Sequence, residues 1–397
     1  MKVLKPIYYD KFECSADKCI ESCCVGWKVA IDKTTYNRYK KVKSNFSKEL
    51  VKGISRNRTG KDIYNYGKMR LTDNKRCIFL NKQNLCNVYI NLGEDYLCNT
   101  CKIYPRSIKK YRNIIERNLT LSCPEVARMI SEIEEKLSFV MEEEKLSSLD
   151  LYNINNGYEN TYIYDLFWQI RSFFIEIAQF REIELWKRLS FLKLCAQKIQ
   201  KLISDGKYNE IDNVINNLTC SITDESVIKS LDNINNSNEV KNLFIDSIIK
   251  MRLKDNLTNT KLLEILVQLD KIIEDNRGNE LEVLEKIESE FDISFKDREY
   301  ILENFIVYTL YKNCMGELES KDINKLITMT ILEYALLKKL FEVKWYSNGG
   351  NLTNEDVIEI MYTFSRTIEH SNFMKKLCNN VKDAGYDSLA YLTILIR

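Results

Sequence analysis

Apolar residues recur at three- and four-residue spacing over most of the chain after residue 160, which predicts long amphipathic helices. The stretch Asp165–Ile203 carries a broad apolar stripe and predicts one or two helices. Aromatic side chains here, such as Trp168 and Phe173, are expected in the core. Further helices are expected near 208–218, 239–253, 259–275, 279–290, 297–314, 321–341, 354–369 and 372–382. This half of the chain is predicted to be a helical domain.

The first part of the chain has a different pattern. Residues 1–123 contain short β-like pieces, such as GWKVAID at 26–32, and many loops. Apolar residues from Val126 to Val140 predict an amphipathic helix that begins just after Cys123. Residues 143–162 are polar and rich in Asn, which favours a linker. We therefore expect a mainly α protein: a cysteine-rich, metal-binding region with little β over 1–142, then an all-helical domain over 163–397.

Composition agrees with long helices, since the 397 residues include only 3 Pro and 12 Gly. With 59 Lys and Arg against 57 Asp and Glu, the net charge points to no partner. The segment 33–70 carries 12 Lys and Arg against Glu49 and Asp62, so it is either a solvated face or an anion-facing surface. The start of the chain has no apolar run of secretory length, and no stretch approaches about eighteen apolar residues. A cytoplasmic protein without a membrane partner is expected.

Cysteine is the informative residue type, because the chain has 13 Cys and a single His. In a reducing cytosol, clustered cysteines are more often metal ligands than disulfides. Thiolates select zinc, copper(I) or iron–sulfur centres, and four suffice for one zinc ion or one [4Fe–4S] cluster. Composition does not decide between an iron–sulfur cluster and zinc, nor does it show which four cysteines are the ligands. Cys98 and Cys101 have a spacing that lets both reach one centre. The nine candidate ligands are Cys14, Cys19, Cys23, Cys24, Cys77, Cys86, Cys98, Cys101 and Cys123.

Several cofactor motifs are absent from the sequence. Cys19 and Cys23 lack the third cysteine of the radical S-adenosylmethionine (SAM) triplet, because Gly26 stands where it is needed. Neither GxGxxG nor GxxxxGK[ST] occurs, which excludes a dinucleotide fingerprint and a P-loop. A nucleotide-like cofactor would have to bind by other means.

The cysteine motifs resemble those of the flagellin lysine-N-methylase family. The resemblance is dense over 12–125 and includes a looser match near the C-terminus, from Phe364 to His370. The matching motifs are Phe12-x-Cys14-x4-Cys19-x3-Cys23-Cys24-x-Gly26-Trp27-x-Val29-x-Ile31-Asp32, Cys77-x-Phe79-Leu80, Leu85-Cys86-x-Val88-Tyr89, Leu92-Gly93-Glu94, Leu97-Cys98-x-Thr100-Cys101-x-x-Tyr104-Pro105-Arg106, Cys123-Pro124-Glu125 and Phe364-Ser365-Arg366-x-Ile368-Glu369-His370. The resemblance implies methyl transfer from SAM to lysine side chains of flagellin. It also implies an iron–sulfur cluster, [4Fe–4S] in type, with zinc as the alternative.

Site residues follow from the same motifs. His370 is the only histidine, and with Arg366 and Glu369 it is the candidate catalytic group; the alternative is a histidine that merely ends a helix. Trp27, Tyr104 and Arg106 lie in the densest motifs and are expected beside the cluster, as packing or as a second layer of contacts.

Two other functions remain open from the sequence. One is a non-catalytic, metal-stabilised binding module whose basic segment 33–70 meets nucleic acid or an acidic protein. The other is a redox protein that uses the same cluster. Because no nucleic-acid-binding motif is recognisable, nucleic acid is not the expected partner. The sequence leaves open the SAM site, the role of the cluster, the degree of methylation and the oligomeric state.

Overall fold

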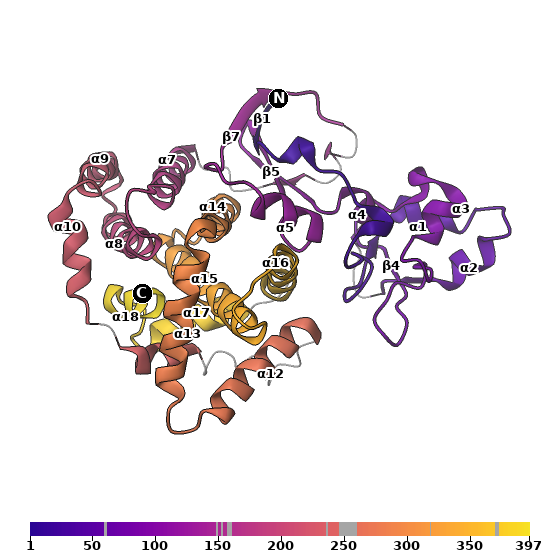
Figure 1. Cartoon of the computed structure of the whole chain (residues 1–397). Helices are drawn as coiled ribbons and strands as arrows, with labels where there is room; N and C mark the ends of the chain where they lie inside the picture. The colour runs from indigo at the N-terminus through magenta and orange to yellow at the C-terminus, as the bar shows by residue number, and fades with distance from the viewer. Residues whose placement is uncertain are drawn as a thin grey trace. The chain divides into compact units, whose positions relative to one another are not determined.

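The computed structural model describes residues 1–58, 62–147, 150–151, 154–156, 161–235, 237–245, 260–317, 319–369 and 373–397. The chain divides into two compact units (Figure 1). Unit 1 comprises Met1–Val126 and Phe139–Asn156, and unit 2 comprises Ala127–Ser138 and Gly157–Arg397. Residues 127–138 thus belong to unit 2 although they lie between two stretches of unit 1 in the sequence, and we call them the exchanged segment.

Unit 1 contains a five-stranded sheet in the order β7-β1-β6-β5-β8. β1 lies between β6, to which it is parallel, and β7, to which it is antiparallel. β5 and β6 form an antiparallel hairpin, and β8 runs parallel to β5. The strands are β1 (Lys2–Pro6), β5 (Arg106–Tyr111), β6 (Ile114–Leu119), β7 (Phe139–Glu143) and β8 (Asn155–Asn156). The segment expected to be a linker, 143–162, thus contributes to two strands of this sheet.

A second, three-stranded sheet of unit 1 lies beside the cysteine motifs. Its order is β2-β4-β3, and both pairings are antiparallel. The remaining elements of this region are short helices, whose core contains Tyr39, Leu50 and Phe79. The elements are β2 (Ala30–Ile31), β3 (Ile54–Arg56), β4 (Gly67–Met69), α1 (Lys33–Tyr39), α2 (Ser47–Lys52), α3 (Asn87–Leu92) and α4 (Asn99–Ile103). The expectation of little β in the N-terminal region is not confirmed, since the two sheets organise it.

The helix predicted from Val126 to Val140 is correct only in its first part. α5 (Pro124–Ser131) begins directly after Cys123, as expected, but the chain then leaves the helix. Residues 139–143 form β7 and pair with β1, more than 130 residues earlier. The apolar spacing was compatible with a helix, but the distant strand supplies backbone partners that a local pattern cannot reveal.

The regular elements of unit 2 are helices over the residues that the structure describes, which confirms the mainly α prediction. The helix expected near 239–253 falls partly on 246–259, outside the described residues. α10 and α18 were not predicted. The helices are α7 (Thr161–Ala178), α8 (Leu185–Ser204), α9 (Ile211–Ser221), α10 (Glu225–Ser230), α12 (Thr260–Asp275), α13 (Glu280–Phe295), α14 (Tyr300–Asn313), α15 (Ile323–Ser347), α16 (Asn354–Glu369), α17 (Phe373–Asp383) and α18 (Leu389–Ile396).

α15 is the central helix of unit 2. It packs against α8, α12, α13, α14, α16, α17 and α18, and Figure 1 shows these helices around it. Its buried residues occur on every side of the helix, as expected for a helix enclosed by others. They include charged residues, among them Glu333, Lys338 and Glu342. Charged groups at these positions need partners inside the unit.

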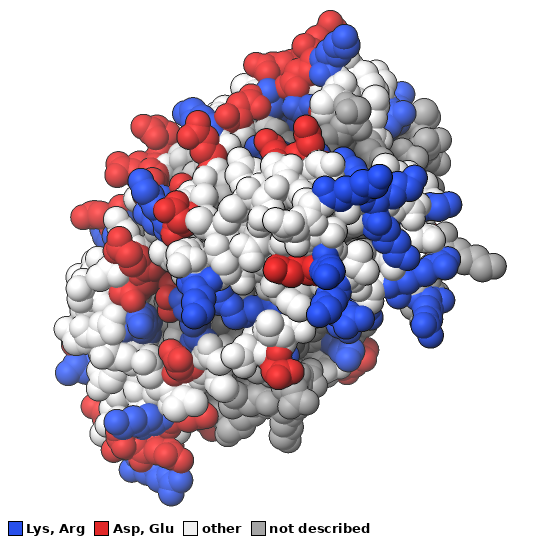
Figure 2. All heavy atoms as spheres, turned by 90° about the vertical axis from the view of Figure 1, so that its right-hand side faces the viewer, with Lys and Arg blue, Asp and Glu red and all other residues white. Residues whose placement is uncertain are grey.

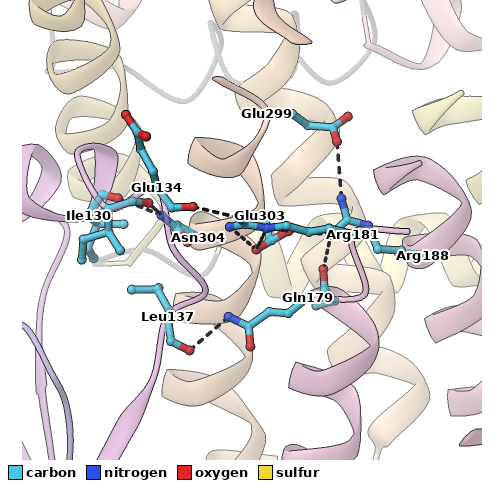
Figure 3. Close-up of polar contacts among 11 residues, drawn as sticks. Ile130, Glu134, Leu137, Gln179, Arg181, Arg188, Glu299, Glu303 and Asn304 are labelled. Atoms are coloured by element: carbon cyan, nitrogen blue, oxygen red, sulfur yellow. Dashed lines mark hydrogen bonds and ion pairs between the residues drawn. The ribbon is translucent and has the colours of Figure 1, made fainter. Parts of the chain in front are cut away.

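An ion-pair cluster fixes the exchanged segment to the helices of unit 2 (Figure 3). Arg188 Nη1 donates to Glu303 Oε2 at 2.6 Å, and the two side chains are 3% and 1% exposed. Arg181, in the loop between α7 and α8, donates to both oxygens of Glu303 at 3.0 and 3.1 Å. Glu299 lies 3.3 Å from Arg188 Nη2. We call Arg181, Arg188, Glu299 and Glu303 the ion-pair cluster.

Backbone carbonyls of the exchanged segment are satisfied by side chains around this cluster. Asn304 Nδ2 donates to the carbonyl oxygens of Ile130 and Ile133, at 3.0 and 2.6 Å. Arg181 Nη1 donates to that of Glu134, and Gln179 Nε2 donates to that of Leu137 (Figure 3). Since these carbonyls have tertiary partners, the chain does not need to continue the helix beyond Ser131.

None of the helices within the described residues combines the length and apolarity that crossing a lipid bilayer requires.

Candidate functional site

Five cysteines surround one part of the core of unit 1. Cys77 and Cys98 are buried in it, and Cys24, Cys86 and Cys101 pack against it. The Sγ atoms of Cys98 and Cys101 are 3.5 Å apart, which agrees with their two-residue spacing at the start of α4. The Cys77 N–H donates to the Cys24 carbonyl at 2.7 Å and joins two distant motifs. We call these five residues the core cysteines.

The core cysteines influence one another's protonation. The thiols of Cys98 and Cys101 are hydrogen-bonded to each other, and this bond lowers the pKa of Cys98 and raises that of Cys101 well above its ordinary value. Burial raises the pKa of Cys77 to about 12 and also raises the pKa of Cys86. The Cys23 hydrogen bond lowers the pKa of Cys24 to about 7. The negative charges of neighbouring thiolates oppose ionisation of several together, so a cation is needed to stabilise them jointly.

The other four cysteines of the motifs form a second group, Cys14, Cys19, Cys23 and Cys123, which we call the outer cysteines. Burial raises the pKa of Cys123 to about 11, and the charges of Cys19 and Cys14 raise it further. Backbone N–H groups of Val126 and Glu125, at the start of α5, act in the opposite direction. Cys123 lies at the predicted helix N-terminus, but burial outweighs the stabilisation of a thiolate there. The hydrogen bond with Cys24 and burial raise the pKa of Cys23, and the charges of Cys14 and Cys123 raise it further.

The core cysteines fit a thiolate-bound centre by chemistry, because five soft donors share one region that is closed off by apolar side chains. Over the part of the chain that the structure describes, no three Cys, His, Asp or Glu side chains are arranged to hold a metal ion. All thirteen cysteines are free thiols. The structure thus gathers candidate ligands into two groups without a closed coordination site.

Two of the three residues expected beside the cluster lie together. The rings of Trp27 and Tyr104 are 6.1 Å apart, and Trp27 Nε1 donates to the Cys23 carbonyl at 2.6 Å. They therefore lie beside the outer cysteines. Arg106, at the start of β5, instead places its guanidinium 5.1 Å from the ring of Phe12.

The basic segment 33–70 carries exposed cations, and some of its cations contact tyrosine rings. Lys40, Lys41 and Lys43 are exposed. Lys40 lies 4.9 Å from the ring of Tyr36, and Lys33, Arg38 and Arg56 also lie over tyrosine rings. Figure 2 shows Lys and Arg side chains gathered over one part of the molecular face that it presents. The contacts between these cations and the tyrosine rings are made within unit 1 itself.

Near the C-terminus, Glu369 belongs to a polar group between helices. Its Oε2 lies 2.8 Å from Lys312 Nζ, and its Oε1 accepts from the Tyr308 hydroxyl at 2.9 Å. Arg366, one turn earlier on α16, stacks on the ring of Tyr362 at 4.9 Å. The two expected catalytic residues thus have different contacts. His370 lies outside the described residues.

Sequence reasoning missed Glu333, a carboxyl group in the centre of α15. It is 6% exposed, and burial raises its pKa to about 8. The charge of Glu369 raises this pKa further, whereas Lys312 and a hydrogen bond from Thr309 lower it. We call Tyr308, Thr309, Lys312, Glu333 and Glu369 the carboxyl site. Its only signal in the sequence is one acidic residue within an apolar helical run.

Comparisons with known proteins place the chain in a methyltransferase family. Residues 171–395 match the family described as the FliB lysine N-methylase C-terminal domain. Because the match covers more than half of the chain, the protein belongs to the FliB lysine N-methylase family. The resemblance noted in the sequence is confirmed, and with it the prediction of an enzyme of the lysine N-methyltransferase class.

Particular relatives extend the similarity beyond unit 2. The chain is 23% identical to the Lysine-N-methylase of Salmonella typhimurium (strain LT2) over 394 residues, which covers 94% of this chain and 93% of the relative. The Lysine-N-methylase of Salmonella choleraesuis (strain SC-B67) gives the same values. The Flagellar biosynthetic protein FliU of Salmonella muenchen is 32% identical over 132 residues, 32% of this chain and 76% of the relative. No solved structure matches the chain.

Proposed function

We propose that the protein transfers a methyl group from SAM to lysine side chains of flagellin. The observation that carries this proposal is the family match over 171–395, together with similarity to lysine N-methylases along nearly the whole chain. The name of the FliU relative adds a flagellar connection. Membership of an enzyme family favours this function over a binding module or a redox protein.

The chemistry requires a neutral amine. A lysine ε-amino group has a pKa of about 10.4, so only roughly one in a thousand is unprotonated at neutral pH. The methylsulfonium group of SAM supplies an electrophilic methyl carbon, and the protein must supply a site that binds the lysine and removes a proton. We assign this task to unit 2, where the expected residues Arg366, Glu369 and His370 end α16 and follow it.

We further propose that the core cysteines hold an iron–sulfur cluster, [4Fe–4S] in type. Five thiols around one buried region, with no histidine among them, support an all-thiolate centre. Such a centre would give unit 1 a covalently bonded core and a redox-active group. Trp27 and Tyr104 would lie beside the outer cysteines, which are the second group of ligand candidates. A cytoplasmic location would keep the thirteen thiols reduced.

Methyl transfer is tested with purified protein, flagellin and SAM carrying a deuterated methyl group. Mass spectrometry of the digested flagellin should show deuterated methyl groups on lysine side chains. Flagellin incubated with SAM alone is the control. Methylation of other residue types only, or none at several pH values, would contradict the proposed function.

The centre is tested by elemental analysis of protein purified without oxygen. Iron and acid-labile sulfide in equal amounts, with a brown colour, are expected. Stoichiometric zinc in a colourless protein would replace the iron–sulfur assignment by the zinc alternative. This measurement needs no substrate, so its outcome is independent of the methylation assay.

A further inference from the structure

We propose that a group of cations on unit 1 binds a carboxylate-rich segment of the protein substrate. Lys33, Lys40 and Arg56 lie over the rings of Tyr36 and Tyr66, and we call these five residues the cation–tyrosine patch. The inference rests on the proposed methylation of flagellin and adds a surface that holds this substrate. Neither the family match, which begins at residue 171, nor the names of the relatives assign a role to the patch.

α1 and β3 bring the three cations to the same two rings. Lys33 is the first residue of α1, and its Nζ lies 5.9 Å from the centre of the Tyr66 ring. Lys40 follows the last residue of α1, and its Nζ lies 4.9 Å from the centre of the Tyr36 ring. Arg56 ends β3, with its guanidinium 4.8 Å from the Tyr66 ring. All three cations are exposed, so their charges gather on one small area of the surface of unit 1.

The two rings form a fixed support for these cations. Tyr36 and Tyr66 are in edge-to-face contact, with 5.3 Å between the ring centres. Tyr36 is 6% exposed and lies so close to β4 that a Cβ atom at Gly67 would collide with its ring. Gly67 in turn pairs with Arg56 between β4 and β3. Helix, sheet and aromatic pair therefore hold the cations in place before any partner binds, which lowers the cost of binding.

The patch has no counter-charge of its own. Over the residues that the structure describes, none of its three cations is ion-paired with a carboxylate. Asp32, which precedes α1, is buried, and its oxygens accept from the N–H groups of Thr35 and Asn99. Elsewhere in unit 1 a cation does have acidic partners, since Lys5 Nζ lies 2.5 Å from Asp10. Like charges that are held close together repel each other, so an anion bound at the patch would relieve this repulsion.

Carboxylates of an acidic protein segment are the anions that fit the patch best. The planar guanidinium of Arg56 matches a carboxylate with two parallel N–H donors, and the lysines add point charges. Nucleic-acid strands usually gain affinity by stacking bases on aromatic faces, but the rings here already have cations over them. The proposed substrate is itself a protein. We therefore assign the patch to an acidic segment of flagellin.

The first test measures the kinetics of flagellin methylation in the deuterated-methyl assay. A neutralised variant carries Lys33→Gln, Lys40→Gln and Arg56→Gln together. Its KM for flagellin should rise by about tenfold at unchanged kcat, because three exposed ion pairs to the substrate are lost. A charge-conserving variant with Lys33→Arg, Lys40→Arg and Arg56→Lys should keep most of the wild-type affinity. A general structural role would not produce this separation of KM from kcat.

A matched control removes the same net charge from unit 1 at other exposed lysines. These lysines lie over no aromatic ring among the described residues. The control variant carries Lys48→Gln, Lys52→Gln and Lys82→Gln. Its KM should stay at the wild-type value. An equal rise of KM in the control and the neutralised variant would overturn the patch as a specific site, as would an unchanged KM in the neutralised variant.

The second test needs no methylation. Fluorescence anisotropy follows the binding of labelled poly-L-glutamate to the full-length protein without SAM. The wild type should bind it with an affinity that falls as the salt concentration rises, and the neutralised variant should bind it about tenfold more weakly. Equal binding by both proteins would overturn the patch. Binding of oligothymidylate in place of poly-L-glutamate would overturn the choice of an acidic protein partner.

The two tests separate this inference from the function on which it rests. A wild type that methylates no lysine overturns the proposed function, and poly-L-glutamate binding then decides about the patch by itself. Methylation with a KM that does not respond to the neutralised variant overturns the patch and leaves the proposed function standing. Circular dichroism of each variant shows whether it is folded, and the charge-conserving variant tests the patch with its charges in place.

Discussion

The cysteine core of unit 1 and the ion-pair cluster of unit 2 bury reactive groups in different ways. Unit 1 buries thiols, such as Cys77 and Cys98, within a small apolar core. Unit 2 buries charges, such as Arg188 and Glu303, and pairs them at 2.6 Å. A thiol tolerates burial as a small apolar group, whereas a buried charge requires a partner. The proposed centre would therefore add stability to the cysteine core of unit 1, whereas the ion-pair cluster of unit 2 supplies its own counter-charges.

The largest effect is expected from removing a core cysteine. Cys98→Ser should reduce bound iron by at least about tenfold, because even contacts beyond the ligands change metal affinity by 10- to 100-fold. Cys220→Ser, at an exposed cysteine in unit 2, is the control and should leave iron unchanged. Iron content and visible absorption are measured on both variants. Equal iron in both would remove Cys98 from the proposed ligands and weaken the contrast between the units.

Glu303→Gln should produce the next largest effect, in unit 2. Breaking a buried ion pair leaves Arg188 and Arg181 without the carboxylate charge, which costs about 3–5 kcal/mol. Urea unfolding should therefore show a lower free energy of unfolding at unchanged iron content. A loss below about 1 kcal/mol would mean that water compensates these charges and that unit 2 does not depend on internal pairing.

Glu333→Gln should change how stability depends on pH. Burial holds the folded-state pKa near 8, above the ordinary value of 4.5, so the folded state keeps a proton that the unfolded state has lost. The wild type therefore loses stability as the pH rises from about 5 to 8, and Gln cannot ionise. Relative to the wild type, the variant should gain ~2–3 kcal/mol between about pH 6 and pH 9, at ~1.4 kcal/mol per pKa unit. Parallel stability curves for the two proteins would contradict a buried, protonated Glu333.

The smallest effect is expected at an exposed ion pair of unit 2. Lys229 and Glu225 lie 2.6 Å apart on α10, with side chains 71% and 82% exposed. Glu225→Gln should leave the free energy of unfolding unchanged within the error of the measurement, because solvent and salt screen such pairs. The same urea experiment measures it. A loss comparable to that of Glu303→Gln would mean that burial does not set the importance of charge pairs here.

Local signals predicted most of the described helices of unit 2, although not α10 and α18. α16 was predicted at 354–369 and occupies Asn354–Glu369, because Thr353 and Asp356 mark its start by hydrogen-bonding each other's backbone N–H groups. The pattern over 165–203 did not decide between one helix and two. The structure has two, since α7 ends at Ala178 and α8 begins at Leu185. There the Ala178 carbonyl accepts from Arg188, a tertiary contact that periodicity cannot indicate.

Non-local pairings could not be predicted. β1 acquires its partners from residues 114–119 and 139–143, so neither its role nor the end of α5 was visible in the local pattern. The cysteine spacing indicated the ligand candidates, but their separation into core and outer groups depends on how distant loops fold. Glu333 was missed for the same reason, since its importance arises from Lys312 and Glu369 on neighbouring helices.

The position of β1 determines the order in which unit 1 can form during synthesis. The first strand emerges from the ribosome early, but β7 is translated about 130 residues later, which takes roughly 7–30 s at 5–20 residues per second. All nine motif cysteines leave the ribosome before β7 does. Nascent chains therefore expose these thiols while the large sheet is still incomplete.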